Sequence, residues 1–297
     1  MRVFLTGASG WIGSAVIGEL RVAGHEVVGL ARSEASAVRI EASGASAVRG
    51  DLGDLDVLRR EADRADGVVH CGYLHDFSRM GDAALLDRGA IEAFADVLAW
   101  TGKPLVVTSG VGLVRPGHVV TERDRHVLGS GGHPRADNAE IALALAERGV
   151  RVSVVRPAPT VHGDGDHGFV PFLIGVARRA GVAGYVGDGT NRWCAVHRFD
   201  CASLYKRALE DAPAGSVLHA VAEQGIPTRE IAEAIGRGLG LPVRSIEPGD
   251  AAAHFEWMAM FWSADIPASS DLTREALGWQ PTHPGLIADL EAGHYFA

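Results

Sequence analysis

The sequence predicts an α/β protein, with a Rossmann-type, doubly wound parallel sheet followed by a smaller C-terminal lobe. Residues 1–13 place a short apolar strand directly before the pattern Thr6-Gly7-x-x-Gly10-x-x-Gly13. Strand-like and helix-like runs alternate through the first half of the chain, which is typical of βαβ units. After residue 163, glycine and proline become frequent, the helix-like runs shorten and tryptophans gather.

The glycine pattern predicts a dinucleotide site at the start of the first helix. Gly7 allows a sharp turn, Gly10 allows backbone N–H groups to approach a pyrophosphate, and Gly13 allows the helix to pack closely against the strand. The helix N-terminus adds free N–H groups and a partial positive charge. A glycine-rich structural turn is the alternative. The remaining residues of the predicted loop are Ser9, Trp11 and Ile12.

The order of the elements sets the domain organisation. We expect strands at 3–6, 26–31, 67–71, 104–108 and 150–155, and helices at 55–64, 83–100 and 136–148. Such alternation predicts a parallel sheet that helices cover on both faces. We therefore expect residues 1–163 to form the dinucleotide-binding domain. Residues 164–297 are expected to form the lobe, interleaved with the last elements of the sheet.

Composition excludes several classes of protein. The formal net charge of −9 over 297 residues argues against a nucleic-acid surface, which needs a basic stripe. No apolar run approaches the length of a membrane span, and a strand that begins within two residues leaves no room for a signal peptide. The three cysteines have neither metal-site nor disulfide spacing. We expect a cytoplasmic protein with a small-molecule substrate and no metal.

Further motifs follow the glycine pattern in a fixed order. They are Gly-Asp-Leu at 50–52, an acidic loop at 121–124, Thr-Ser-Gly at 108–110, and the segments 156–163, 193–200 and 277–281. Taken together, and over essentially the whole chain, they resemble the extended branch of the short-chain dehydrogenase/reductase superfamily. That branch contains nucleotide-sugar epimerases, dehydratases and related reductases.

The resemblance assigns further residues to the cofactor. It implies that Asp51 hydrogen-bonds the adenine amino group and that Leu52 lies beside the ring; the alternative is that Asp51 caps the next helix. Cys71 and Gly72 match positions that line the ribose and nicotinamide, and Pro157 belongs to the segment that touches the carboxamide.

The end of the second strand favours NADP(H) over NAD(H). NAD enzymes usually place Asp or Glu there to bind the ribose 2′-hydroxyl, and a carboxylate would repel a 2′-phosphate. This chain instead has Arg32 followed by Ser33. A planar guanidinium suits bidentate contact with phosphate. A solvated arginine at a strand end is the alternative.

The superfamily's usual catalytic pair, Tyr-x-x-x-Lys on the helix after the fifth strand, is absent. The only lysines are Lys103 and Lys206, and no tyrosine falls in the required stretch. The chain therefore resembles an atypical subgroup that keeps the nucleotide pattern and lacks the pair. What replaces the proton donor is left open by the sequence.

Three residues are candidates for the catalytic group. His133 falls near the missing tyrosine, titrates near neutral pH and has a spacing to Asp137 that suits a pair on one helical face. Ser109 stands where the family places its substrate-orienting hydroxyl, next to Thr108, which we also place beside the cofactor. Tyr73 follows the fourth strand, with His75 and Asp76. The alternatives are a polar loop residue for His133, a helix cap for Ser109 and a packed rim aromatic for Tyr73.

These observations predict an NADPH-dependent reductase of a small or medium organic carbonyl, imine or enone. A site without the usual proton relay suits the reduction of an iminium or a conjugated acceptor. These reductions depend less on a well-placed proton donor than the reduction of a simple ketone does. The alternatives are a non-catalytic NADP(H) sensor and an epimerase or dehydratase. The late aromatic residues are read either as an apolar ligand enclosure or as core. The helices at 83–100 and 136–148 match the family's dimer helices, so a homodimer is one expectation.

Overall fold

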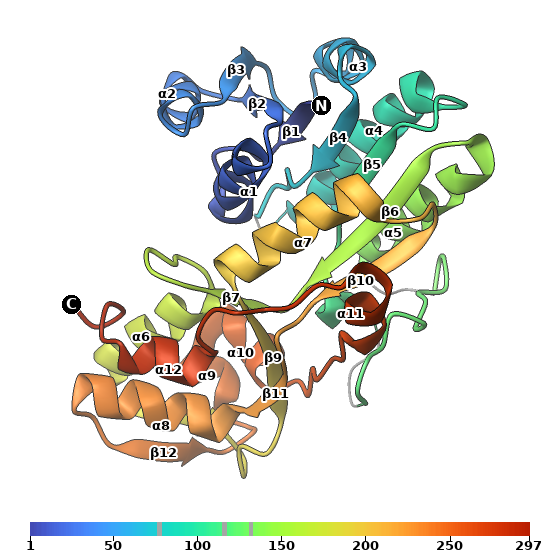
Figure 1. Ribbon diagram of the computed structural model, residues 1–297. Helices are drawn as coiled ribbons and strands as arrows, with labels where there is room; N and C mark the ends of the chain where they lie inside the picture. The colour runs from blue at the N-terminus through green and yellow to red at the C-terminus, as the bar shows by residue number, and fades with distance from the viewer. Residues whose placement is uncertain (76–78, 115–117, 131–132) are drawn as a thin grey trace.

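Seven parallel strands form the central sheet of the protein, seen here in a computed structural model that describes residues 1–75, 79–114, 118–130 and 133–297. The sheet order is β10-β6-β5-β4-β1-β2-β3, so that the chain starts in the middle and winds outward in both directions (Figure 1). This confirms the predicted doubly wound Rossmann-type fold. The strands are β1 (Arg2–Thr6), β2 (Glu26–Ala31), β3 (Ser46–Arg49), β4 (Gly67–His70), β5 (Pro104–Thr108), β6 (Arg151–Pro157) and β10 (Ser216–Ala220).

Helices cover both faces of this sheet, because its strands are apolar on both sides. One apolar core lies under α1 (Trp11–Val22), α2 (Glu34–Ala42) and α7 (Arg198–Asp211). The other lies under α3 (Leu55–Arg64), α4 (Met80–Leu98) and α5 (Pro134–Leu143). The predicted strands at 26–31 and 104–108 and the helix at 55–64 have the observed bounds.

The helix after β5 begins two residues earlier than predicted. Its first residue is Pro134, which is favoured there because a proline at this position loses no hydrogen bond and has a suitable φ. After Leu143 the chain tightens into a 3₁₀ segment, Ala144–Arg148, and ends at Gly149 in the left-handed conformation. This start of α5 decides which side chains face the site.

The C-terminal lobe lies at one end of the sheet (Figure 1). It contains a three-stranded and a two-stranded sheet. The first joins β7 (Thr160–His162), β9 (Arg192–His197) and β11 (Glu223–Pro227), and the second joins β8 (Ala183–Val186) and β12 (Val243–Ile246). Its helices are α6 (Phe169–Ala180), α8 (Thr228–Leu239), α9 (Ala251–Phe255), α10 (Ala259–Trp262), α11 (Asp271–Leu277) and α12 (Leu286–Glu291). Between these segments the chain returns to the main sheet as α7 and β10.

The aromatic residues of the lobe are mostly core. Trp193, Phe255 and Trp262 are each 1% exposed, and the rings of Trp193 and Trp262 meet edge to face at 5.1 Å. Phe169 packs on Trp193 at 5.7 Å. The alternative of a packed core is therefore the correct one for these three residues, and they do not line a ligand enclosure.

Two indole and guanidinium contacts join the lobe to the start of α1. Trp11 Nε1 donates a hydrogen bond of 2.7 Å to the carbonyl of Val161 in β7. Arg198, the first residue of α7, stacks over the Trp11 ring at 4.1 Å and donates to the Trp11 carbonyl at 2.9 Å. The glycine-rich loop is thus held against both the sheet and the lobe.

Within the described ranges, no helix has the length and apolar character that crossing a membrane requires.

A buried polar chain connects β4 to α4 and α5. His70 bonds Thr6 Oγ1 through Nδ1 at 2.7 Å and Asp87 Oδ1 through Nε2 at 3.1 Å. The other carboxylate oxygen of Asp87 accepts from Asn138 Nδ2 at 2.7 Å. Burial alone would raise the pKa of Asp87, but the bonds from His70 and Asn138 and the charge of Arg135 hold it below its ordinary value.

We expect Asp87→Asn to lower the free energy of unfolding by about 1.5–3 kcal/mol near neutral pH, because an amide leaves one of the two buried donors without an acceptor. A carboxylate with a lowered pKa stabilises the fold above its unfolded pKa and loses this effect as pH falls through the folded value. The difference between variant and wild type should therefore shrink below about pH 4. Urea unfolding across pH measures it. Asp56→Asn, on a fully exposed side chain of α3, is the control, and an equal loss there would contradict the prediction.

Candidate functional site

The site lies where the sheet order reverses, between the carboxyl ends of β1 and β4. Doubly wound folds bind ligands at this point. The loops after the two strands touch. A Cβ on Gly7, which has φ +67°, would lie 2.7 Å from the backbone of Cys71 and Gly72. Glycine is therefore required at position 7 both for its conformation and for the close approach.

The first turn of α1 is open toward the crevice. A Cβ on Gly13 would lie 2.1 Å from the Gly7 carbonyl oxygen, so the helix packs directly on the turn. The helix has no side-chain N-cap bond and no acidic residue in its first turn. Its N–H groups and positive dipole end are thus available to an anion. The Trp11 side chain contacts the lobe, so any contact of Trp11 with a cofactor would come from its backbone.

Arg32 projects from the end of β2. It is exposed and forms no hydrogen bond or ion pair with any residue that the structure describes. The Ser33 hydroxyl caps α2 by accepting from the Ser36 N–H at 3.2 Å, and its contact with a phosphate stays a prediction. Arg49, on the neighbouring strand, is paired with Glu34 at 3.2 Å. Arg32 is therefore the unpaired cation at this edge.

Asp51 and Leu52 shape the turn after β3. Asp51 Oδ1 accepts from Gly53 N–H at 2.7 Å, and Asp51 N–H donates to Asp54 at 2.8 Å. Asp54 is the N-cap residue of α3, so the helix-cap alternative for Asp51 is wrong. Leu52 lies beside the loop after β4, since a Cβ on Gly72 would lie 3.0 Å from its methyl group. The adenine role of Asp51 stays a prediction.

The ends of β4 and β5 are fixed by buried hydroxyls. Thr108 Oγ1 bonds the His70 carbonyl and the Tyr205 hydroxyl, both at 2.8 Å. Burial raises the pKa of Cys71 to about 11, so this thiol is not a nucleophile near neutral pH. Thr108 therefore holds the wall of the site through its side chain. Its contact with the cofactor, like those of Cys71, Gly72 and Pro157, stays a prediction.

Tyr73 and Arg135 form a pair that the sequence analysis did not predict. The Arg135 guanidinium carbon lies 4.0 Å above the Tyr73 ring, and the Tyr73 hydroxyl is buried without a partner among the described residues. Burial raises the pKa of Tyr73, and the charge of Arg135 opposes that rise. Arg135 could have been found as the only cation in the stretch that should carry Tyr-x-x-x-Lys.

His133 does not form the predicted pair with Asp137. Because α5 begins at Pro134, His133 is its N-cap, and its Nδ1 accepts from the Arg135 N–H at 3.2 Å. Asp137 instead bonds His126 at 2.9 Å and the Gly129 N–H at 3.0 Å. Burial and the charge of Arg135 lower the pKa of His133, so its imidazole is neutral near neutral pH.

The other catalytic candidates have fewer contacts. Ser109 is buried, and its N–H donates to the Val155 carbonyl at 2.8 Å, while its hydroxyl bonds no described residue. His75 meets the Tyr73 ring at 5.3 Å. Asp76 lies outside the described residues. Of the three candidates, Tyr73 is the one whose ring stacks against the Arg135 guanidinium.

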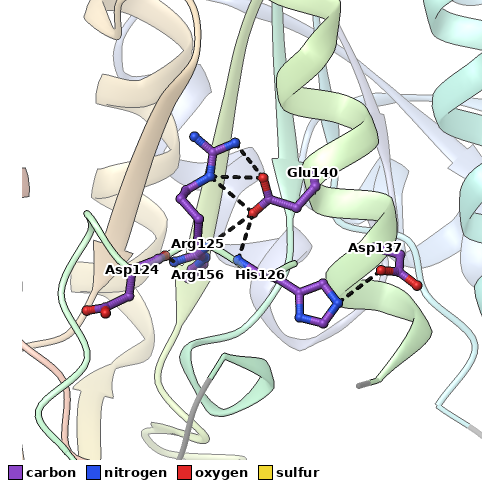
Figure 2. A network of polar contacts seen from close by, with 6 residues as sticks. All are labelled: Asp124, Arg125, His126, Asp137, Glu140 and Arg156. Atoms are coloured by element: carbon purple, nitrogen blue, oxygen red, sulfur yellow. Dashed lines mark hydrogen bonds and ion pairs between the residues drawn. The ribbon is translucent and has the colours of Figure 1, made fainter. Parts of the chain in front are cut away.

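A network of ion pairs holds α5 in place (Figure 2). Glu140, on α5, accepts from the Arg125 side chain at 2.9 Å and from the His126 N–H at 3.2 Å. Arg156 of β6 lies 3.7 Å from Glu140 and donates to the Asp124 carbonyl at 2.8 Å. The end of the predicted acidic loop is therefore held between α5 and β6 by these contacts. Glu140 also compensates the charge of the buried Arg156.

Comparison with known proteins bears on the family and the fold of the chain. The sequence model of the NAD-dependent epimerase/dehydratase family matches residues 3–101. An uncharacterized protein of Schizosaccharomyces pombe is 46% identical over 300 residues and covers 100% of both chains. A 4-hydroxy-2-methyl-3-oxo-4-farnesyl-3,4-dihydroquinoline-1-oxide ketoreductase of Stigmatella aurantiaca is 26% identical over 292 residues, 90% of this chain and 84% of the relative. The structure of MoeE5 in complex with UDP-glucose and NAD superposes with a TM-score of 0.75 and 23% identity over 100% of this chain and 98% of the other, a likeness of fold.

We expect Glu140→Gln to lower the free energy of unfolding by about 3–5 kcal/mol, because it leaves Arg156, 2% exposed, as an uncompensated buried charge. The control is Glu92→Gln on α4, whose pair with Arg88 is half exposed and should contribute about 0–1 kcal/mol. Urea unfolding of both variants measures the difference. An equal loss of unfolding free energy in both variants would show that the network in Figure 2 stabilises the protein no more than an exposed ion pair does.

Proposed function

This chain belongs to the NAD-dependent epimerase/dehydratase family, and we propose that it is an NADPH-dependent reductase of a small or medium organic carbonyl, imine or enone. The observation that carries the proposal is a close-packed glycine turn together with Arg32, an exposed cation that pairs with no described residue, in a chain that lacks the Tyr-x-x-x-Lys pair. The ketoreductase relative from Stigmatella aurantiaca shows that carbonyl reduction occurs among proteins similar to this one.

The residues present fit a dinucleotide phosphate. The cradle around Gly7 and Gly13 has no room for a Cβ, as close approach of backbone to ligand requires. The open first turn of α1 would hold the pyrophosphate. Arg32, where NAD enzymes usually have a carboxylate, would hold a 2′-phosphate. When bound, NADPH supplies a hydride to an acceptor carbon. The protein must then orient the acceptor and deliver a proton to its oxygen or nitrogen.

Tyr73 is the proton donor that we propose. Its hydroxyl is buried, has no partner among the described residues and belongs to a ring that lies against the Arg135 cation. In the usual Tyr-x-x-x-Lys pair, one helix provides both a phenol and a nearby cation. Here the phenol comes from the loop after β4 and the cation from α5. His133 is a poorer donor because its lowered pKa leaves it unprotonated near neutral pH.

A non-catalytic NADP(H) sensor is the second candidate, because α5 carries neither the tyrosine nor the lysine of the usual pair. It shares the cradle and Arg32 with the reductase, so cofactor binding does not separate the two. Turnover does. NADPH consumption with a ketone, an enone or a cyclic imine supports the reductase, and tight binding without turnover of any of them supports the sensor.

We expect Arg32→Ala to weaken NADPH binding by about tenfold to a hundredfold and to leave NADH binding unchanged, because one charge-assisted phosphate contact contributes about 1.5–3 kcal/mol. Titration of protein fluorescence with each cofactor measures this. Arg49→Ala, an already paired arginine at the same edge, is the matched control. Parallel losses for NADPH and NADH would contradict a 2′-phosphate contact.

We expect Tyr73→Phe to reduce kcat by about 10²–10⁴-fold with cofactor binding unchanged, because general acid catalysis contributes on that order. The pH profile identifies the donor. With Tyr73, whose pKa is raised, the rate stays level through neutral pH and falls only as alkaline pH removes its proton. A donor with the lowered pKa of His133 would instead lose activity as pH rises through the mildly acidic range. Ser109→Ala and His133→Ala are measured in the same way for comparison. An unchanged kcat in Tyr73→Phe would exclude Tyr73 as the proton donor.

A further inference from the structure

We propose that Arg135 is an anion-binding subsite of this protein, built to contact a substrate oxygen that carries or gains negative charge. The inference deepens the proposed function and rests on it for the placement of the substrate beside Tyr73. It narrows the proposed substrates to carbonyls and enones, including those with an adjacent carboxylate, and it excludes iminium ions.

The first argument is that the Arg135 side chain is buried and has no ion-pair partner among the described residues. Its residue is 9% exposed, and Nε is excluded from solvent with no hydrogen-bond partner. Its side chain forms no ion pair or hydrogen bond with any residue in the described part of the chain. Asp87 is near enough to feel its charge, but both carboxylate oxygens are already used by His70 and Asn138.

The second argument is that this arrangement is costly without a ligand. Removing a cation from water costs several kcal/mol unless an anion or a set of acceptors compensates it. The Tyr73 ring at 4.0 Å offers a cation–π contact, which contributes only about 0.5–2 kcal/mol. An arriving oxygen anion would complete the compensation, and the guanidinium fork fits a carboxylate or enolate.

The third argument is the local field. Arg135 is in the first turn of α5, a helix of 10 residues, where the helix dipole adds partial positive charge. His133 caps this turn as a neutral group and adds no negative charge. The two nearby carboxylates bond other groups: Asp137, in the same turn, bonds His126 and the Gly129 N–H, and Asp87 bonds His70 and Asn138. Among the described residues, the charge without an ion pair at this turn is therefore the positive one of Arg135. Such a field attracts oxygen anions and repels a cationic iminium.

Binding of benzoate tests the subsite apart from turnover. Calorimetric titration with benzoate, and with neutral benzamide as its isostere, is done at saturating NADP⁺, so that Arg32 and the cradle are occupied. We expect Arg135→Met to weaken benzoate binding at least tenfold and to leave benzamide binding unchanged, with partial recovery in Arg135→Lys. Arg123→Met, an exposed arginine on the acidic loop, should bind benzoate like wild type.

Two results would overturn the inference. One is benzoate binding that is absent in wild type or unchanged in Arg135→Met. The other is an equal loss of benzamide binding, which would show that the arginine merely supports the structure. Circular dichroism melting of each variant confirms that it folds, and Arg135→Lys keeps the test valid if the methionine variant does not.

Turnover separates this inference from the proposed function. If benzoate binding depends on Arg135 but no carbonyl, imine or enone consumes NADPH, the subsite stands and the reductase proposal fails. If reduction occurs equally in wild type and Arg135→Met, or if the cyclic imine is reduced faster than the enone, the reductase stands and the subsite fails.

Discussion

The arrangement of the site depends on one buried carboxylate, that of Asp87. It receives His70 from β4 on one oxygen and Asn138 from α5 on the other, at 3.1 and 2.7 Å. One side chain on α4 therefore fixes the end of a central strand and the helix that carries Arg135. Its two oxygens bond His70 and Asn138, and no ion pair joins it to the guanidinium beside Tyr73 in the described part of the chain. The same acid therefore holds the scaffold and acts on Arg135 only through its charge.

The fold could be predicted from the sequence because its strongest signals are local. Gly7, Gly10 and Gly13 form a recognisable pattern within seven residues, and Gly13 contacts the Gly7 carbonyl directly. The alternation of strands and helices likewise follows from short-range patterns. The site is less local. Tyr73 and Arg135 are separated by more than sixty positions, and only the packing of α5 against α4, β5 and β6 brings them together.

The wrong details have physical reasons as well. His133 was paired with Asp137 on the assumption of a helix through both, but Pro134 starts the helix and makes His133 its cap. Ser33 accepts from the Ser36 N–H at the start of α2, and its contact with a phosphate stays a prediction. Trp193 and Trp262 were open to two interpretations because a large apolar ring serves a core and a ligand wall equally well. Only their burial distinguishes the two.

The return of the chain from the lobe to the sheet has a consequence for synthesis on the ribosome. Strand β6 gains its outer neighbour only when β10, at Ser216–Ala220, has been made, and α7 covers the sheet only shortly before that. Until then a nascent chain exposes an apolar strand edge, the feature that templates aggregation. The nucleotide half therefore completes its sheet late in translation, and a protein shortened after residue 163 would present that edge permanently.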